Sequence, residues 1–159
     1  MNDVLDPRVE EIIGTVELEI RALIGVIISD HEKSFIREGL NMTRKRTPNN
    51  YASVLVDMED ITRLESEYNY LIYSLIQYLE KYNVEFRSQY NAIVASLTRA
   101  GRPNQAAVEA EALARDNNKL LLLKNRNDRL EQLISYLKTE IAIIRSKTKT
   151  LDAKRSNTF

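Results

Sequence analysis

The chain has 159 residues, of which 43% are apolar and 29% are charged, a composition typical of one soluble domain. It contains no cysteine, which excludes a disulfide framework and cysteine-based zinc or thiol chemistry, and no segment has the roughly 18 uncharged apolar residues of a membrane span. The net charge is zero, but residues 1–80 carry −7 and residues 81–159 carry +7, so the two halves either neutralise each other in the fold or leave a basic surface for a polyanion.

An N-terminal helix is predicted over residues 6–38. Asp6 is suited to cap it and Pro7 fits the first helical position. Gly14 and Gly25 fall on almost the same side of this helix, where they either permit close approach of another backbone or merely loosen the helix. Apolar side chains recur at spacings of three and four and predict one buried stripe, formed by Val9, Ile12, Ile13, Val16, Ile20, Leu23, Ile24, Ile27 and Ile28.

Residues 41–50 are predicted to form a polar and basic loop, because Gly39 is expected to end the preceding helix. Arg44, Lys45 and Arg46 make this loop the densest positive cluster in the acidic half of the chain. Such a loop either contacts a phosphate backbone or is simply solvated.

Two long helices are predicted over residues 51–100 and 104–154. The first run contains no Gly or Pro, and Gly101 and Pro103 supply a short turn that makes its neighbour antiparallel. The predicted fold is therefore all-α: an elongated antiparallel helical hairpin of coiled-coil type with an additional N-terminal helix. It forms a single helical domain over residues 1–159.

The second long helix carries an apolar seam whose spacing alternates between three and four residues, and this seam is predicted to join copies of the chain. Its members are Leu120, Leu123, Asn127, Leu130, Ile134, Leu137, Ile141 and Ile144. Asn127 is expected either to fix the register by pairing with another polar group or to face solvent. In the first long helix the heptad spacing changes after Tyr82, which predicts a kink or a straightening over residues 83–90.

Tyr70 and Tyr73 lie off the seam of the first long helix. Exposed tyrosines are large amphipathic surfaces, so these two suit packing between subunits or stacking on bases.

Catalytic and metal-binding patterns are missing from the sequence. His31 is the single histidine, and no Glu-x-x-His arrangement, Gly-rich phosphate loop or nucleophile elbow is present. We therefore predict a protein that is not an enzyme and that uses no cofactor and no metal.

The end of the second long helix is basic. These cations either stabilise the C-terminal end of the helix dipole or, summed over several copies, form a surface for a polyanion. Between residues 136 and 155 the acidic residues are Glu140 and Asp152, against Lys138, Arg145, Lys147, Lys149, Lys154 and Arg155.

The segment from Asp116 to Arg145 is a Leu/Ile-rich helix that leads into a short basic stretch and a terminal Phe159. It follows an aromatic and basic helix that ends in a Gly-containing turn, residues 82–101. This combination, over residues 65–159, resembles the phage recombination mediators of the UvsY type. The resemblance implies an all-helical, ring-like homo-oligomer that binds single-stranded DNA and helps to load a RecA-like recombinase in place of a single-strand binding protein. A cytoplasmic location is expected separately, because cysteine is absent and residues 1–6 do not resemble a secretory leader.

Two other functions fit the same sequence: a structural coiled-coil scaffold, such as a virion component, and a small phage protein that inhibits a host protein through the tyrosine-rich helix. If DNA is bound, Tyr90 is the predicted base-stacking residue. The residues predicted to contact phosphates are Arg87, Arg99, Arg102, Arg145, Lys147 and Lys149.

Overall fold

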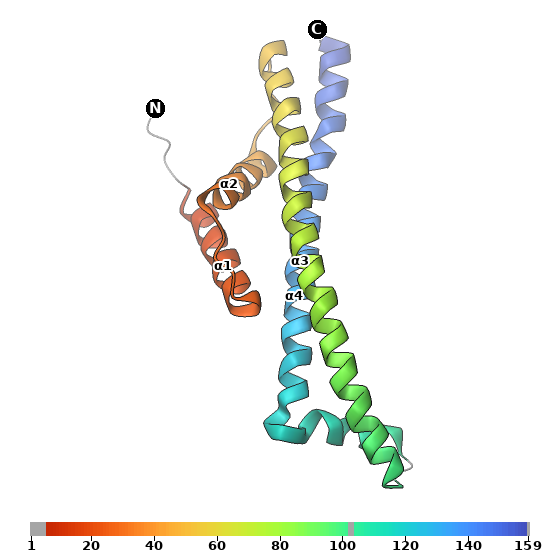
Figure 1. The fold of residues 1–159 in the computed structure, drawn as a ribbon. Coiled ribbons are helices and arrows are strands. Elements are labelled where there is room, and N and C mark those ends of the chain that lie inside the picture. The colour runs from red at the N-terminus through yellow and green to blue at the C-terminus, as the bar shows by residue number, and fades with distance from the viewer. Residues whose placement is uncertain (1–5, 102–103, 159) are drawn as a thin grey trace. The chain divides into compact units, whose positions relative to one another are not determined.

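The computed structural model describes residues 6–101 and 104–158, and within them the chain is all-α (Figure 1). The predicted fold class is confirmed. The helices are α1 (Pro7–Ile24), α2 (Asp30–Arg44), α3 (Tyr51–Arg99) and α4 (Gln105–Thr158).

The helices are organised in two compact units, each of which contains a part of both long helices. Unit 1 consists of Met1–Ser74 and Leu133–Phe159 and therefore holds α1, α2, the first half of α3 and the second half of α4. Unit 2 is Leu75–Gln132, which includes the turn between α3 and α4. In unit 1 the part of α4 runs beside the part of α3, as expected for a helical hairpin, whereas in unit 2 the beginning of α4 (teal) lies crosswise to α3 (Figure 1).

The predicted helix over residues 6–38 is in fact two helices. Asp6 caps the first one as expected, since its carboxylate accepts a hydrogen bond of 2.9 Å from the backbone N–H of Arg8. Gly25 then adopts a left-handed conformation with φ of 70° and ends α1. Ser29 begins α2 through a reciprocal capping box with Glu32, a pattern that is visible in the sequence. Apart from the adjacent residues and the backbone of the same helix, no atom of the described residues lies within 4 Å of a Cβ built on Gly14 or Gly25, so neither glycine marks a close approach.

The loop predicted over residues 41–50 is shorter, because α2 continues to Arg44 and only residues 45–50 connect it to α3. Gly39 lies inside α2 and does not end it. Its role is steric: a Cβ on Gly39 would lie 2.8 Å from ring carbons of Tyr68 on α3. The close approach that glycine permits in unit 1 is therefore at Gly39.

The second long helix is interrupted, which corrects the predicted continuous helix over 104–154. Arg115 has extended backbone angles, and Asp116, Asn117 and Asn118 have φ of 51°, 57° and 63°. Asp and Asn tolerate this left-handed region better than other residues with a Cβ, which explains why the break falls on an Asp-Asn-Asn run. This break in α4 was not predicted from the sequence.

The seam of α4 lies inside the chain. Asn127 is only 5% exposed and donates a hydrogen bond of 3.2 Å to the side-chain oxygen of Asn83 on α3, which confirms the expected polar pairing. The seam predicted to join copies therefore faces the helix α3 of the same chain and is not available to a second copy. Its members Leu120, Leu130, Ile134, Leu137, Ile141 and Ile144 are buried, and Leu123 is half-buried.

A buried polar cluster connects three helices in unit 1. Tyr68 on α3 is fully buried and its hydroxyl donates to a carboxylate oxygen of Glu140 on α4, beside the carbonyl oxygen of Ile36 on α2. Glu140 is 4% exposed, and among residues 6–101 and 104–158 its other oxygen, Oε2, has no hydrogen-bond partner. Burial of the carboxylate is the largest influence on its pKa, which rises to about 7 although the hydroxyls of Tyr68 and Tyr136 act in the opposite direction.

Candidate nucleic-acid interface

Two basic segments that lie about a hundred residues apart in the sequence meet in unit 1. The ammonium group of Lys147 on α4 donates a hydrogen bond of 2.7 Å to the backbone carbonyl of Lys45. About two turns further along α4, Lys154 donates a hydrogen bond of 3.0 Å to the side-chain oxygen of Asn49. The loop over residues 45–50 is thus fastened to the last turns of α4. We call the resulting surface the basic face, formed by Lys45, Arg46, Lys147, Lys154 and Arg155. Lys149 is two residues from Lys147, about 200° around α4, and therefore lies on the opposite side of that helix.

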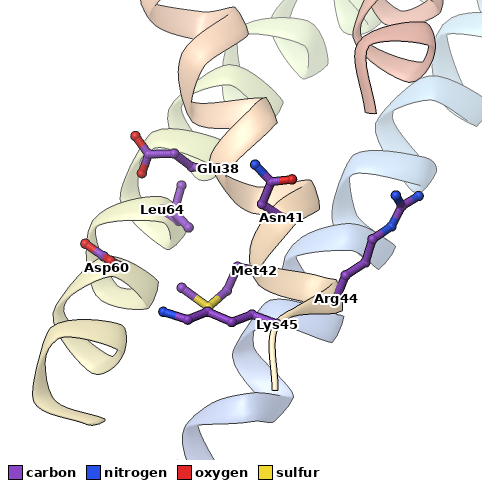
Figure 2. A pocket seen from close by; sticks show the side chains of 7 residues that line it. All are labelled: Glu38, Asn41, Met42, Arg44, Lys45, Asp60 and Leu64. Carbon is purple, nitrogen blue, oxygen red and sulfur yellow. The ribbon is translucent and has the colours of Figure 1, made fainter. Parts of the chain in front are cut away.

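The loop leaves α2 over a small pocket between α2 and α3 (Figure 2). This pocket has a volume of about 380 Å³, and Met42 and Leu64 approach each other across it. Lys45 extends from the end of α2 toward α3, where its ammonium group pairs with Asp57, whose side chain is 3% exposed. Arg44 points to the other side and binds Asp6 at 2.8 Å. Lys45 therefore neutralises a buried carboxylate and fixes the start of the loop.

The cations of the basic face differ in how far they are already neutralised. Arg155 pairs with Asp152 at 3.3 Å, and Lys45 pairs with Asp57. Arg46 is exposed, and among residues 6–101 and 104–158 no acceptor or carboxylate contacts its side chain. The Arg46 side chain is free to bind an external anion.

Lys147 is half-buried beneath the loop. Burial lowers its pKa, the negative charge of Asp57 opposes this change, and the positive charge of Lys45 adds to it. A partly desolvated ammonium group whose hydrogen-bond partner is a neutral carbonyl gains from a nearby external negative charge. Lys147 is therefore placed to support an anion bound to Arg46, the residue that follows Lys45 in the loop.

The predicted phosphate-contact residues do not form one group within a single unit. Arg145, Lys147 and Lys149 lie in unit 1, and Arg145 is paired with Glu65 at 3.3 Å. Arg87 and Arg99 are exposed in unit 2, where the guanidinium group of Arg87 donates to the backbone carbonyl of Asn83 at 3.4 Å. Arg102 lies outside the described residues.

Tyr90 is involved in packing within unit 2. Its ring stacks on that of Phe86, with centroids 5.7 Å apart and planes 16° from parallel. It also packs against a small core formed by Leu97, Val108 and Ala112. The ring predicted to stack on bases is therefore half-buried between protein groups.

Tyr51 is an aromatic residue beside the basic face that sequence reasoning did not select. It is the first residue of α3, directly after the loop, and is 47% exposed. The adjacent Asn50 caps α3 by accepting a hydrogen bond of 2.8 Å from the backbone N–H of Ser53. The sequence already showed an aromatic residue after a basic loop and at a helix start. Only the contact of the loop with α4 shows that this residue follows a loop to which a second basic segment is bound.

The described ranges 6–101 and 104–158 contain no group of three or more His, Cys, Asp or Glu side chains that could hold a metal ion. Within the same ranges, every helix is too short or too polar to cross a lipid bilayer. No protein-family model, curated protein or solved structure matches the chain.

Proposed function

We propose that the protein is a non-enzymatic helical protein that self-associates and binds single-stranded DNA through the basic face of unit 1. The observation that carries this proposal is the attachment of the loop to α4 by Lys147 and Lys154. This attachment brings together two basic segments that lie about a hundred residues apart in the sequence and leaves Arg46 exposed on the loop beside the last turns of α4. Phosphates are the natural ligand of such a surface, because multiple cations release condensed counterions when they bind a nucleic-acid backbone.

Single strands are favoured over duplexes because of Tyr51. An exposed aromatic ring beside a row of cations can stack on an unpaired base, whereas the bases of a duplex already stack on one another. Loading of a RecA-like recombinase in place of a single-strand binding protein is the role that the resemblance to recombination mediators adds to this proposal.

The first test is the salt dependence of binding to a fluorescently labelled oligothymidylate, followed by anisotropy. In the double variant Arg46→Gln/Arg155→Gln we expect weaker binding, because two exposed cations of the basic face, and with them two phosphate contacts, are lost. The slope of log affinity against log salt should become shallower by about 1.4, since each contact to a single strand contributes about 0.7.

A matched control is the double variant Arg21→Gln/Lys138→Gln, which removes two exposed cations of unit 1 that lie outside the basic face. This control should keep the wild-type slope. Equal losses in both double variants would show that only net charge matters. Absence of salt-dependent binding in the wild-type chain would reject the DNA-binding function, and an oligomer without DNA affinity would favour the structural scaffold.

A second test concerns the preference for single strands. Tyr51→Ala should weaken binding of oligothymidylate by about 1–3 kcal/mol, the usual contribution of one base stacked on an aromatic ring. Binding of a duplex of the same length should change little, because its bases remain paired. Competition between the two DNA forms measures the ratio directly, and an unchanged ratio would remove Tyr51 from the site.

A further inference from the structure

Unit 1 carries a second surface feature, a groove of about 560 Å³ between the α1–α2 connection, α2 and α3. Its base is apolar, because Phe35 and Leu71 are 4% and 5% exposed and line it. Its wall contains Val26 and Tyr70, and the ring of Tyr70 is 79% exposed. We call this feature the tyrosine groove.

The rim of the tyrosine groove is acidic. Glu32 and Glu67 line it, together with the exposed His31, which lies 3.2 Å from Glu67. The nearest arginine, Arg63, is shared among the carboxylates of Glu38, Asp60 and Glu67. Glu38 and Asp60 line the other pocket, so Glu67 receives only a share of the Arg63 guanidinium group. The Glu32 carboxylate accepts hydrogen bonds from Ser29 and forms no ion pair with a described cation, so negative charge remains beside the apolar base and the exposed ring of Tyr70. The complementary ligand is an apolar side chain flanked by cations.

Unit 2 presents such a ligand on α4, directly after the left-handed break. In the segment Lys119–Lys124, Leu122 is 63% exposed and Leu121 is 36% exposed, whereas the seam residue Leu120, which precedes them, is buried. Lys119 and Lys124 are both exposed, and within the described part of the chain neither side chain makes an ion pair or a hydrogen bond. Two exposed leucines between unpaired lysines are an unusual combination for a surface that contacts only water.

We propose that the tyrosine groove of one copy binds the Lys119–Lys124 segment of a second copy, with Leu122 against Tyr70 and the lysines against Glu32 and Glu67. The charges are complementary, and both apolar surfaces lose their exposure to water. The two surfaces differ, so the contact is heterologous, and repetition of it produces a closed ring or a filament. This inference rests on the self-association in the proposed function, but it does not involve the basic face.

The test uses two point variants of the full chain and measures mass by light scattering over a range of protein and salt concentrations. Tyr70→Ser removes the ring from the groove, and Leu122→Ser removes the ligand. Both side chains are largely exposed, so the folded chain should persist, which thermal unfolding checks. Each variant should weaken association by at least about 20-fold, as expected for a central interface residue. High salt should weaken the wild-type association.

Mixing the two variants gives the decisive result. A Tyr70→Ser chain still has an intact Leu122 segment, and a Leu122→Ser chain still has an intact tyrosine groove. An equimolar mixture should therefore form a heterodimer that cannot grow further, although each variant alone is monomeric. Leu18→Ser is the matched control, because Leu18 is 66% exposed on α1 and does not line the groove. It should assemble like the wild-type chain.

The outcomes separate the two proposals. A wild-type chain that is monomeric at every concentration would overturn both the interface and the self-association in the proposed function. A wild-type oligomer that survives in both variants would overturn only the interface. Variants that dissociate but fail to form a heterodimer on mixing would exclude the groove–segment pairing. If the pairing were correct, the intact groove of the Leu122→Ser chain would bind the intact segment of the Tyr70→Ser chain.

Discussion

Glu140→Gln is expected to raise the free energy of unfolding by about 3 kcal/mol at pH 8 and by less than about 1 kcal/mol at pH 5. The carboxylate is 4% exposed, and its Oε2 has no hydrogen-bond partner within the described residues. Glutamine keeps an oxygen that can accept the hydrogen bond from Tyr68 but carries no charge. The variant therefore removes the cost of a buried negative charge and keeps the hydrogen bond.

The sign of the pH dependence follows from proton binding. Burial raises the pKa of Glu140 from the ordinary 4.5 to about 7 in the folded chain, so between these values the folded state holds more protons than the unfolded state. The wild-type chain is then most stable below about pH 4.5 with respect to this group, loses stability as the pH rises to about 7, and changes little above it. The groups that face the carboxylate are Tyr68 on α3 and Tyr136 on α4, with Arg44 of α2 acting on Tyr136.

Urea unfolding at a series of pH values measures this difference directly. A suitable control is Glu59→Gln, which neutralises an exposed carboxylate of α3 in unit 1 and should change the free energy of unfolding by less than about 0.5 kcal/mol. If the difference in free energy of unfolding between Glu140→Gln and the wild-type chain is the same at pH 5 and at pH 8, the Glu140 carboxylate does not titrate in this range.

Gly39→Ala is expected to destabilise unit 1 by about 1–3 kcal/mol, although the same change in most helices is stabilising. A Cβ at this position would lie 2.8 Å from ring carbons of Tyr68. The ring is fully buried and its hydroxyl is fixed by Glu140, so it has no free space into which it can move. Either the ring leaves its position or α2 moves away from α3.

Gly14→Ala is the matched control for Gly39→Ala, because Gly14 also lies inside a helix of unit 1 but has no atom within 4 Å of a built Cβ. It should stabilise the chain by up to about 1 kcal/mol through helix propensity alone. In chemical unfolding, the change in the free energy of unfolding relative to the wild-type chain should therefore have opposite signs in the two variants. A stabilising effect at both positions would show that the Tyr68 ring yields without cost.

Helix boundaries show where local sequence is sufficient and where it is not. The caps of α1 and α2 are local, so Asp6 and the Ser29–Glu32 pair could be recognised from residue type and spacing. Gly39 was read as a helix end because glycine alone carries no indication of a neighbour. Only the position of Tyr68, 29 residues further along the chain, explains why a glycine is needed inside α2.

The candidate site depended even more on distant contacts. The cations of the loop and of α4 were each visible as charge clusters, but their meeting requires hydrogen bonds between residues separated by more than a hundred positions. Likewise, the negative charge at the tyrosine groove arises because Glu32 of α2 and Glu67 of α3 line the same groove, and Arg63 is shared between Glu67 and two carboxylates outside it. Patterns along one helix do not contain this information.

The periodic spacing of apolar side chains made the helical class and the apolar seam of α4 readable from the residues alone, because both depend on spacing within single helices. The short turn after Arg99 was readable from Gly101 and Pro103, because these residue types end and interrupt helices. The partner of that seam, the left-handed break at Asp116–Asn118 and the identity of the exposed cations came from the fold, since each depends on which segments lie together in space. The seam was already visible in the sequence as an apolar stripe, and the fold showed that helix α3 of the same chain covers it.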